Sequence, residues 1–498
     1  MATQLRTVER LRLAARTPKT VTILGAGVSG LVAAYELERR GHRVEVIEAG
    51  GRIGGRVHTH RFGAGPGAPA VELGAMRIKS DHTRTRHYIA QLGLAGDLAE
   101  FDTLLSDQNN LLHVEDTGHV RVRDAPEVLS GRLAGRLGRH RYRPATLVFG
   151  TWLETCLTAI APREFGGRPE VGRELLDVVD GIDLTPYLHA GGARIDLHAV
   201  FADHPRLRTG AFLGRERMLA DVLDETSFAL HRLRSGMDGL TNRLADEVRG
   251  PIALNHEVLG LSVRPDGVDL TLRHGSTIAH HACEYVLCTI PFTVLRTLRL
   301  DGIDADKRAV INETRYWPAT KVALHCREPF WQADGITGGA SYTGGLARQT
   351  YYPPAPDTGD RGAALLVSYT IGPDADELAK LGGPGLLRAV VEEVGRMHPA
   401  LLEPGMVLGS KVQAWGGHRW SRGAAAIRWE QDLGTQQDHR AAAARPQGPL
   451  FFAGEHCSST PAWIEGAIES AIDAVHGIEH SGALRWSRRP AVWKEALG

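Results

Sequence analysis

Three glycines near the start of the chain have the spacing of a phosphate-binding turn. Gly25, Gly27 and Gly30 follow a short β-branched run at residues 21–24. The first glycine allows a tight turn, the second lets the backbone approach a phosphate, and the third lets a helix pack on the strand. The helix predicted at residues 31–40 would point its first amides at that anion. The pattern therefore predicts a site for the pyrophosphate of a dinucleotide.

A carboxylate and an arginine follow in the sequence at spacings that suit the ribose and the phosphates of a dinucleotide. The second predicted strand, residues 43–47, ends on Glu48, where an acid can accept the ribose hydroxyls. Gly54 and Gly55 follow and permit close passage of the backbone, and Arg56 can contact the phosphates as a forked donor. The alternative interpretation is a glycine-rich surface turn with a solvated arginine.

The far end of the chain carries the segments that complete the pattern. Residues 450–456 read Leu-Phe-Phe-Ala-Gly-Glu-His, and residues 463–471 read Trp-Ile-Glu-Gly-Ala-Ile-Glu-Ser-Ala. Together with residues 48–56, they resemble the flavin amine oxidase family, which implies FAD as the cofactor. Cys457 lacks the Ser-Gly-Gly-Cys-Tyr context of covalent attachment, so we expect non-covalent FAD. The FAD-binding residues implied by the resemblance are Gly25, Gly27, Ser29, Gly30, Glu48, Ala49, Arg56, Met76, Arg77, Val258, Gly454, Glu455, Trp463 and Ile464.

The resemblance also implies a mixed α/β (α+β) fold, with a Rossmann-like FAD domain, an antiparallel-sheet substrate domain and an inserted helical subdomain. Residues 252–258 and 267–272 alternate like strands of a small sheet, and a long helix is predicted near 385–397. The expected FAD domain comprises residues 19–80, 236–300 and 440–482; the substrate domain comprises 81–124 and 301–439; the helical subdomain comprises 125–235.

Arg77 is the main candidate for substrate recognition. It lies in the Gly-Ala-Met-Arg segment at residues 74–77, and in similar amino acid oxidases this arginine binds the substrate carboxylate. A planar cation that donates two parallel hydrogen bonds suits that group. Tyr369 matches the family tyrosine that adds a third hydrogen bond. The alternatives are a salt bridge from Arg77 to Glu72 or Asp81, and a core role for the tyrosine.

Lys321 lies inside an apolar predicted strand, where a lysine would normally extend its ammonium outward. In the family, a lysine at this place holds a water against flavin N5 and helps the reduced flavin react with oxygen. The alternative is an ordinary lysine of an edge strand. We therefore take Lys321 as a catalytic residue, together with Trp463.

The aromatic wall of the substrate site departs from the family pattern. Ala425 stands where many relatives carry a tyrosine, whereas Trp463 remains and Trp415 or Trp420 can compensate. We expect Trp463 and Trp420 to contact the substrate. A histidine of the helical subdomain often lies near the amine in this family, and no motif selects among His189, His198, His204 and His231.

Residues 338–343 and 366–372 make the resemblance closest to L-amino acid oxidases. The implied reaction is oxidative deamination: the Cα hydrogen passes as hydride to FAD, the imino acid hydrolyses to a 2-oxo acid and ammonia, and O2 is reduced to hydrogen peroxide. The alternatives are an FAD-dependent amino acid monooxygenase or oxidative decarboxylase, a monoamine or polyamine oxidase, and a non-catalytic flavoprotein that serves protein interaction.

The amino acid composition gives no support for some classes of binding partner. Lys and Arg total 58, as do Asp and Glu, so the formal net charge is zero and gives no attraction to nucleic acid or an anionic membrane. No apolar run reaches membrane-spanning length. Five scattered cysteines fit a reducing compartment, and residues 1–18 lack the apolar core of a secretory signal. We therefore expect a cytoplasmic protein, and a homodimer.

Overall fold

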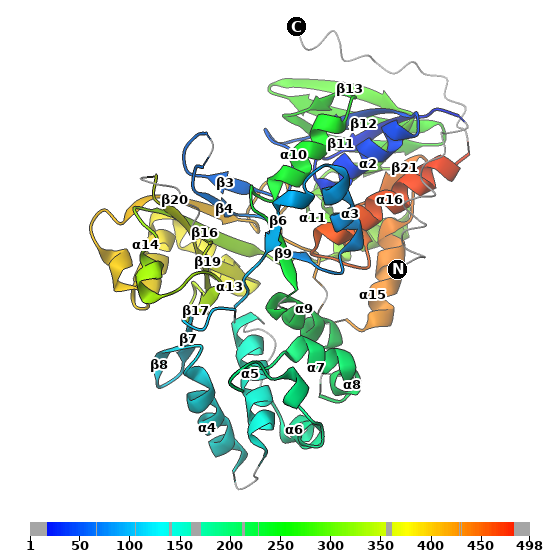
Figure 1. Cartoon of the computed structure of the whole chain (residues 1–498). Coiled ribbons are helices and arrows are strands. Elements are labelled where there is room, and N and C mark those ends of the chain that lie inside the picture. The colour runs from blue at the N-terminus through cyan, green and yellow to red at the C-terminus, as the bar shows by residue number, and fades with distance from the viewer. Residues whose placement is uncertain are drawn as a thin grey trace.

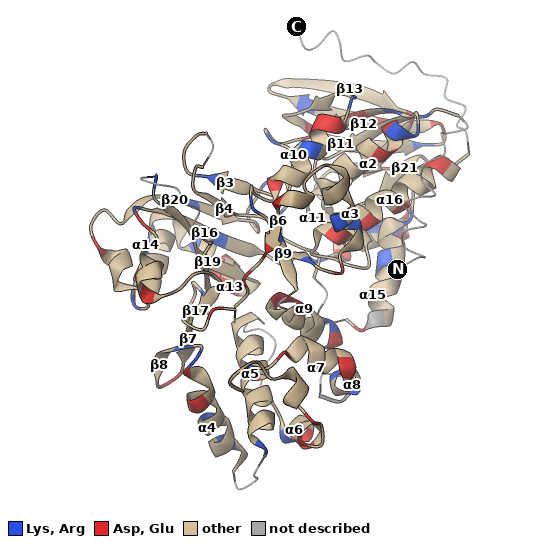
Figure 2. Cartoon of the chain, viewed as in Figure 1, with Lys and Arg blue, Asp and Glu red and all other residues tan. Residues whose placement is uncertain are grey.

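The chain folds into three regions that meet at the centre of the molecule (Figure 1). The first contains a parallel sheet, the second a seven-stranded sheet, and the third is a group of helices. The predicted mixed α/β fold is thus confirmed. Basic and acidic residues are interspersed over all three regions (Figure 2). The computed structural model describes residues 17–482 except 66, 105, 139–141, 161–170, 212–214, 228, 355–360, 428 and 430.

The parallel sheet joins strands from both ends of the chain, in the order β10-β2-β1-β14-β21. The central strand β1 (Thr20–Leu24) pairs with β2 (Arg43–Ile47) and β14 (Tyr285–Cys288), and β21 (Leu450–Phe452) pairs with β14. Four of the five residues of β1 are buried, as expected for an apolar β-branched strand covered on both faces. Segments more than 400 residues apart therefore form one sheet.

Two helices pack against each other beside this sheet. They are α2 (Val28–Arg39) and α16 (Ile464–His480), which the sequence places at opposite ends of the chain. The isoleucines of α16 at positions 464, 468 and 472 are buried in the same apolar cluster as Leu31 of α2. Repeats of this kind at three- and four-residue spacing bury one helical face. The ends of the dinucleotide pattern are thus brought together.

The small sheet predicted around residue 255 is divided between two sheets. β10 (Ile252–Ala253) extends the parallel sheet beside β2, whereas β11 (His256–Arg264) pairs in antiparallel fashion with β12 (Gly267–His274). Asn255 lies between them with φ of 61°, a left-handed turn that redirects the chain. The prediction that residues 252–258 form one strand is therefore wrong. The sheet is completed by β13 (Thr277–Cys283) and β15 (Arg299–Asp301).

The second region is built on a mostly antiparallel sheet of seven strands. In spatial order they are β20 (Val407–Ala414), β16 (Ala319–Cys326), β19 (Ala363–Ile371), β18 (Gln349–Tyr351), β17 (Ala340–Tyr342), β7 (Leu111–Val114) and β8 (Gly118–Arg121). Only the contact between β17 and β7 is parallel among the described pairs. The helices α13 (Pro373–Lys380) and α14 (Gly382–Gly395) pack against this sheet.

The third region consists of helices that lie within residues 125–235, a span that also includes the strand Leu230–Leu233. They are α4 (Ala125–Leu137), α5 (Pro144–Ile160), α6 (Arg173–Asp180), α7 (Leu197–Asp203), α8 (Arg206–Ala211) and α9 (Glu216–Thr226). Helix α5 contacts α4, α6, α7 and α9, and its Phe149 and Trp152 are fully buried. Helix α9 lies closest to the centre of the molecule (Figure 1).

Residues 81–124, which the sequence assigned to the substrate domain, are distributed between regions. Helix α3 (Thr83–Gln91) packs on α16 of the first region, whereas β7 and β8 belong to the seven-stranded sheet. A three-stranded sheet of β5 (Ile78–Lys79), β9 (Leu230–Leu233) and β6 (Leu98–Glu100) connects them. The other elements are β3 (Thr59–Arg61), β4 (Ala70–Glu72), α10 (Asp238–Glu247), α11 (Phe292–Leu295), α12 (Ala305–Glu313) and α15 (Leu433–Ala444).

Candidate functional site

A cavity of about 530 Å³ runs between the three regions, and segments far apart in the sequence line it. Its walls come from the glycine turn before α2, the strands β16 and β19, and helix α9. This volume lies in the usual range for a ligand-binding cleft. All predicted site residues line the cavity except Gly30, which lies behind the turn.

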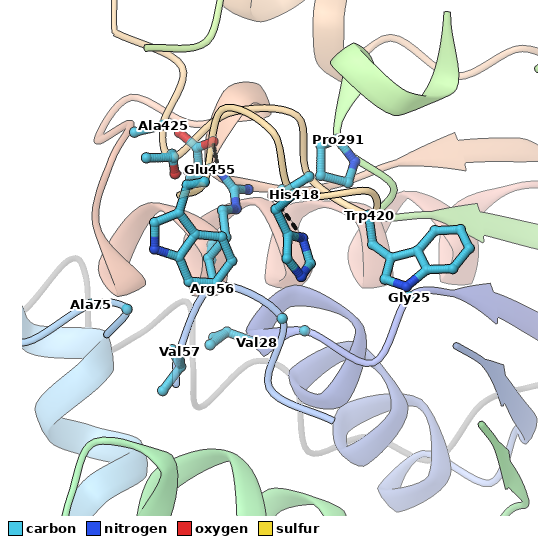
Figure 3. Close-up of a pocket in the computed structure, with 18 of the residues that line it drawn as sticks. Gly25, Val28, Arg56, Val57, Ala75, Pro291, His418, Trp420, Ala425 and Glu455 are labelled. Atoms are coloured by element: carbon cyan, nitrogen blue, oxygen red, sulfur yellow. Dashed lines mark hydrogen bonds and ion pairs between the residues drawn. The ribbon is translucent and has the colours of Figure 1, made fainter. Parts of the chain in front are cut away.

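The glycine turn with Gly25 lies at one end of the cavity (Figure 3). Gly25 has φ of +107°, and a Cβ atom there would lie 2.6 Å from the hydroxyl of Thr289. A Cβ on Gly30 would lie 1.9 Å from the carbonyl oxygen of Gly25, so close packing requires that glycine. Gly27 directly precedes helix α2, and no side chain caps the start of the helix. Its first amides are therefore free to bind an anion.

Glu48 stands where β2 ends, at the same end of the cavity. Its carboxylate accepts hydrogen bonds from the amides of Ala26 at 2.9 Å and Gly50 at 2.6 Å. Burial raises its pKa above the ordinary value, and these amides oppose that effect. The acid is thus held rigidly next to the glycine turn, which is the geometry that ribose recognition requires.

Arg56 makes a contact that the sequence did not predict. We expected it to bind phosphate, but its guanidinium donates to Glu455 at 2.5 Å and to the carbonyl oxygen of Ala424 at 2.9 Å (Figure 3). Burial opposes the charge of Arg56, yet the Glu455 carboxylate raises its pKa on balance. Glu455 also accepts from the amide of Ala462 at 2.9 Å. The pair therefore connects three loops around the cavity.

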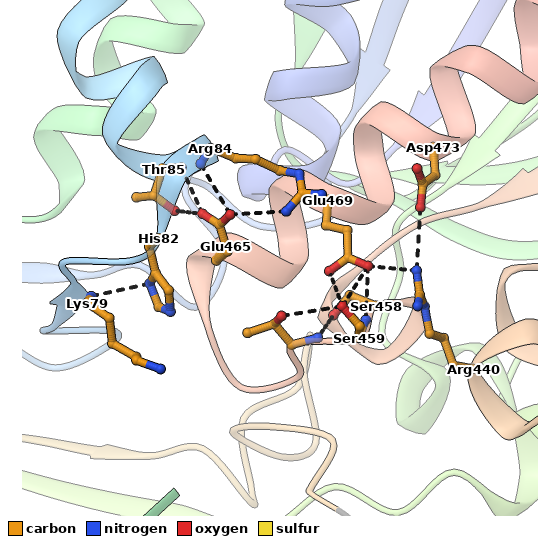
Figure 4. A network of polar contacts seen from close by, with 11 residues as sticks. Lys79, His82, Arg84, Thr85, Arg440, Ser458, Ser459, Glu465, Glu469 and Asp473 are labelled. Atoms are coloured by element: carbon orange, nitrogen blue, oxygen red, sulfur yellow. Dashed lines mark hydrogen bonds and ion pairs between the residues drawn. The ribbon is translucent and has the colours of Figure 1, made fainter. Parts of the chain in front are cut away.

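Trp463 is positioned by acids on the helix that follows it. It precedes α16 and packs edge-on against His82, with ring centroids 5.0 Å apart. Glu465 accepts from the amide and the hydroxyl of Thr85, both at 2.8 Å, and Glu469 accepts from Ser459 at 2.7 Å (Figure 4). These contacts fix the start of α16 between α3 and the loop before it, so the indole of Trp463 is held at the cavity wall.

Arg77 is buried at the other end of the cavity and has one free donor. Its Nη2 lies 2.8 Å from Oε1 of Glu225, whereas its buried Nη1 has no hydrogen-bond partner. Burial works against its charge, but Glu225 raises its pKa above the usual value. Arg77 pairs with Glu225, and not with Glu72 or Asp81 as the alternative interpretation of the sequence predicted. The rings of Phe101 and Tyr369 lie 5.9 Å from the guanidinium carbon.

Lys321 lies in the middle of its sheet rather than at an edge. Its strand β16 is flanked by β19 and β20, so the alternative of an edge-strand lysine is wrong. Its Nζ donates to the carbonyl oxygens of Gly74 at 2.8 Å and Glu72 at 3.2 Å, and lies 4.7 Å from the ring centroid of Tyr369. Burial, assisted by the charge of Arg77, lowers its pKa to about 7.

Trp420 lies at the end of the cavity opposite to the one we expected. A Cβ atom on Gly50 would lie 3.5 Å from its indole ring, and the same position would lie 3.1 Å from Glu48. The loop that carries it therefore reaches the dinucleotide end instead of Arg77. Trp420 thus forms the cavity wall beside Glu48, and the prediction that it contacts substrate near Arg77 does not fit this position.

A second aromatic wall surrounds the Arg77 end, and sequence reasoning missed it. The rings of Trp317 and Trp429 lie 4.8 Å apart, and the indole nitrogen of Trp429 donates to Asp221 at 2.7 Å. Ala425 pairs through its backbone with Trp317, so its small side chain leaves room there. These residues sit in loops without a motif, which is why no sequence signal identified them.

Helix α9 contributes acids to the cavity where we expected a histidine. Asp221 and Glu225 are one helical turn apart and both line the cavity, whereas none of the four candidate histidines does. Residues four apart share one face of a helix. The spacing was visible in the sequence, but nothing local indicated that this face turns toward Arg77.

Comparison with protein families gives one match over nearly the whole chain, to the model of flavin containing amine oxidoreductases at residues 28–478. The flavin-dependent L-tryptophan oxidase RebO of Lentzea aerocolonigenes is 52% identical over 468 residues, which cover 93% of this chain and 98% of that protein. The L-amino-acid oxidase of Pseudechis australis is 24% identical, with 93% of this chain and 87% of that protein covered.

Solved structures show the same fold at lower sequence identity. Putrescine oxidase bound to putrescine superposes with a TM-score of 0.60 at 20% identity, covering 93% of this chain and 99% of that one. Cyclohexylamine oxidase from Brevibacterium oxydans IH-35A gives a TM-score of 0.60 at 19% identity, with the same coverage. At this level of identity, these similarities show that the chain has the same fold. In the described part of this chain, no helix is both long and apolar enough to cross a membrane.

Proposed function

Because this chain belongs to the family of flavin-containing amine oxidoreductases, we propose that it holds FAD non-covalently and oxidises L-tryptophan with O2 as the electron acceptor. The coarser activity follows from the family and the relatives: the protein is an oxidoreductase that deaminates an L-amino acid oxidatively with a bound flavin. The observation that carries the proposal is Arg77, which lines the cavity and whose buried Nη1 has no hydrogen-bond partner.

Arg77 supplies the donor that an α-carboxylate requires. A buried guanidinium nitrogen without an acceptor is costly, and a carboxylate bound there would satisfy it. Tyr369 lies beside it on β19 and can donate its hydroxyl to the same group. A simple amine would leave Nη1 unsatisfied. The site is therefore suited to an amino acid rather than to a monoamine or polyamine.

The surroundings of Arg77 suit an aromatic side chain. Trp317 and Trp429 form one wall with Ile427, and Ile371 lines the cavity nearby. Flat aromatic and aliphatic surfaces bury an indole well. RebO, the relative that shares half of this sequence, is named an L-tryptophan oxidase. Both observations support tryptophan as the substrate.

The other end of the cavity fits FAD. The open amides of α2 would hold the pyrophosphate, Glu48 the ribose hydroxyls, and the loop with Trp420 the adenosine side. When bound, the flavin accepts the hydride equivalent from the substrate Cα–H and passes the electrons on. The chain's own residues orient the amino acid, and the enclosed walls exclude water from the reacting atoms.

Lys321 has the position for assisting the flavin ring. Its ammonium group is fixed by two carbonyl oxygens between Arg77 and the loop at Gly74. We propose that it holds a water at the flavin and supports electron transfer to O2, as the family resemblance implies. The cytoplasmic location and the homodimer stay predictions.

The flavin should be released by acid. All five cysteines are buried thiols, and none of them lines the cavity, so no cysteine is placed to bind the ring covalently. We expect acid precipitation to leave the yellow colour in the supernatant and chromatography of that supernatant to identify FAD. Colour retained in the protein pellet would contradict non-covalent binding, and release of FMN alone would contradict FAD.

Product analysis tests the reaction. The purified protein is incubated with each common L-amino acid, and peroxide, ammonia, the 2-oxo acid and carbon dioxide are measured. We expect L-tryptophan to be oxidised with the highest kcat/KM, with equal amounts of peroxide, ammonia and 2-oxo acid. Release of carbon dioxide with formation of an amide would identify a monooxygenase or oxidative decarboxylase instead.

A further inference from the structure

We propose that Glu225 binds the α-ammonium group of the substrate while Arg77 binds its carboxylate. The inference rests on the proposed function, because it concerns the same L-amino acid and the same end of the cavity. It assigns to helix α9 a direct part in recognising the amino acid backbone.

The geometry of Glu225 places one carboxylate oxygen at the substrate. Oε1 lies 2.8 Å from Nη2 of Arg77, and Oε2 accepts no hydrogen bond within the described part of the chain. The side chain of Glu225 is 16% exposed and lines the cavity, so Glu225 borders the space that a ligand would occupy. A free acceptor thus stands next to the free donor of Arg77.

An α-amino acid presents the matching pair of charges. Its carboxylate and ammonium are attached to one carbon atom, so two receptors for them must lie close together. The free Nη1 of Arg77 and the free Oε2 of Glu225 belong to groups that are already in contact. The pair therefore offers a cation to the carboxylate and an anion to the ammonium without a large rearrangement of either residue.

The other acid on this face of α9 is less suited to the role. Asp221 is engaged by the indole nitrogen of Trp429 at 2.7 Å and by Arg217 at 3.2 Å. Burial raises its pKa, so its charge is less favoured. Asp221 thus stabilises the aromatic wall, and Glu225 remains as the acid available to the ammonium.

The charges of Arg77 and Glu225 also affect whether the substrate or the product binds more tightly. Arg77 and Glu225 together are neutral, as is a zwitterionic amino acid. The 2-oxo acid product keeps the carboxylate but has no ammonium, so Glu225 gives it no attraction and repels it instead. Glu225 should accordingly favour the substrate over its product.

The test compares two ligands that differ only in the amine. In the flavin-loaded Glu225→Gln variant, we measure KM for L-tryptophan and the competitive inhibition constant of indole-3-propionate. Glutamine keeps the shape and can still contact substrate, but removes the charge. We expect KM to rise about tenfold, since a charge-assisted hydrogen bond is lost. The inhibition constant should stay the same or fall, because the anion is no longer repelled.

Two controls make the result decisive. Asp224→Asn, on the same helix, removes a contact to Lys79 at 3.0 Å outside the cavity and should change neither constant. Glu225→Asp keeps the carboxylate, so its preference for L-tryptophan over indole-3-propionate should lie between those of the wild type and Glu225→Gln.

If Glu225→Gln raises the KM for L-tryptophan and the inhibition constant of indole-3-propionate by the same factor, the proposal is overturned, since Glu225 would then only hold Arg77 in place. Equal tightening of both would also overturn it, since Glu225 would then only obstruct the carboxylate position. If the wild type does not oxidise L-tryptophan, the proposed substrate is wrong. The comparison is then made with the amino acid that it oxidises best and the matching acid without the amine.

Discussion

Arg77→Ala lowers kcat/KM for L-tryptophan at least tenfold. A charge-assisted contact to the substrate carboxylate contributes about 1.5–3 kcal/mol, which corresponds to roughly one to two decades in rate. The variant also leaves Glu225 without its 2.8 Å partner, which adds an unfavourable negative charge where the carboxylate must bind. Steady-state peroxide assays of the flavin-loaded variant measure the effect.

Arg77→Lys and the ligand tryptamine serve as controls for Arg77→Ala. Lysine keeps the positive charge beside Glu225 but lacks the planar fork, so we expect its kcat/KM to lie between the wild type and alanine values. Tryptamine has no carboxylate, so any turnover of it should not fall in Arg77→Ala. Unchanged oxidation of L-tryptophan by the alanine variant would contradict carboxylate binding by Arg77.

Lys321→Met separates reduction from reoxidation of the bound flavin. Methionine preserves the approximate length and removes the ammonium group. Anaerobic reduction by L-tryptophan should remain, whereas reoxidation by oxygenated buffer in the stopped-flow instrument should slow by roughly tenfold or more, because a preorganised charge near the developing anion is lost. Lys307→Met is the matched control, since Lys307 is also fully buried but does not line the cavity. Equal reoxidation rates for Lys321→Met and the wild type would exclude this role.

The pKa of Lys321 gives the same experiment a pH dependence. A lysine is charged below its pKa and neutral above it, and burial lowers this pKa to about 7. The wild-type reoxidation rate should therefore fall as pH rises through about 7. Lys321→Met should lack that decrease. A decrease of equal size in both proteins would assign it to another group.

The dinucleotide end of the site was predictable because its requirements are local. Gly25 and Gly30 are dictated by backbone geometry within one turn, and Glu48 ends the strand that follows. The apolar repeat of α16 likewise identifies its buried face. Patterns of this kind need no knowledge of distant segments, and family resemblance then connected residues 20–56 with residues 450–475.

The substrate end depends on contacts between distant segments. Glu225 reaches Arg77 across 148 positions of the chain, and α9 itself carries no motif. The same reason explains the error at Trp420. Its position in the sequence suggested a place near the substrate, but the sequence does not show in which direction its loop extends. Strand β10 has only two residues, Ile252 and Ala253, and the chain turns soon afterwards at Asn255. So short a segment carries no pattern that could have predicted its place in the parallel sheet.

Anaerobic titration of the flavin-loaded protein tests the central claim most directly. Purified protein is mixed without oxygen with L-tryptophan or with tryptamine, and the visible absorbance of the flavin is followed. We predict that L-tryptophan bleaches the flavin completely and rapidly, and that tryptamine does so far more slowly, because only L-tryptophan carries the carboxylate that Arg77 binds. Bleaching by tryptamine as fast as by L-tryptophan, or no bleaching by any L-amino acid, would contradict the account.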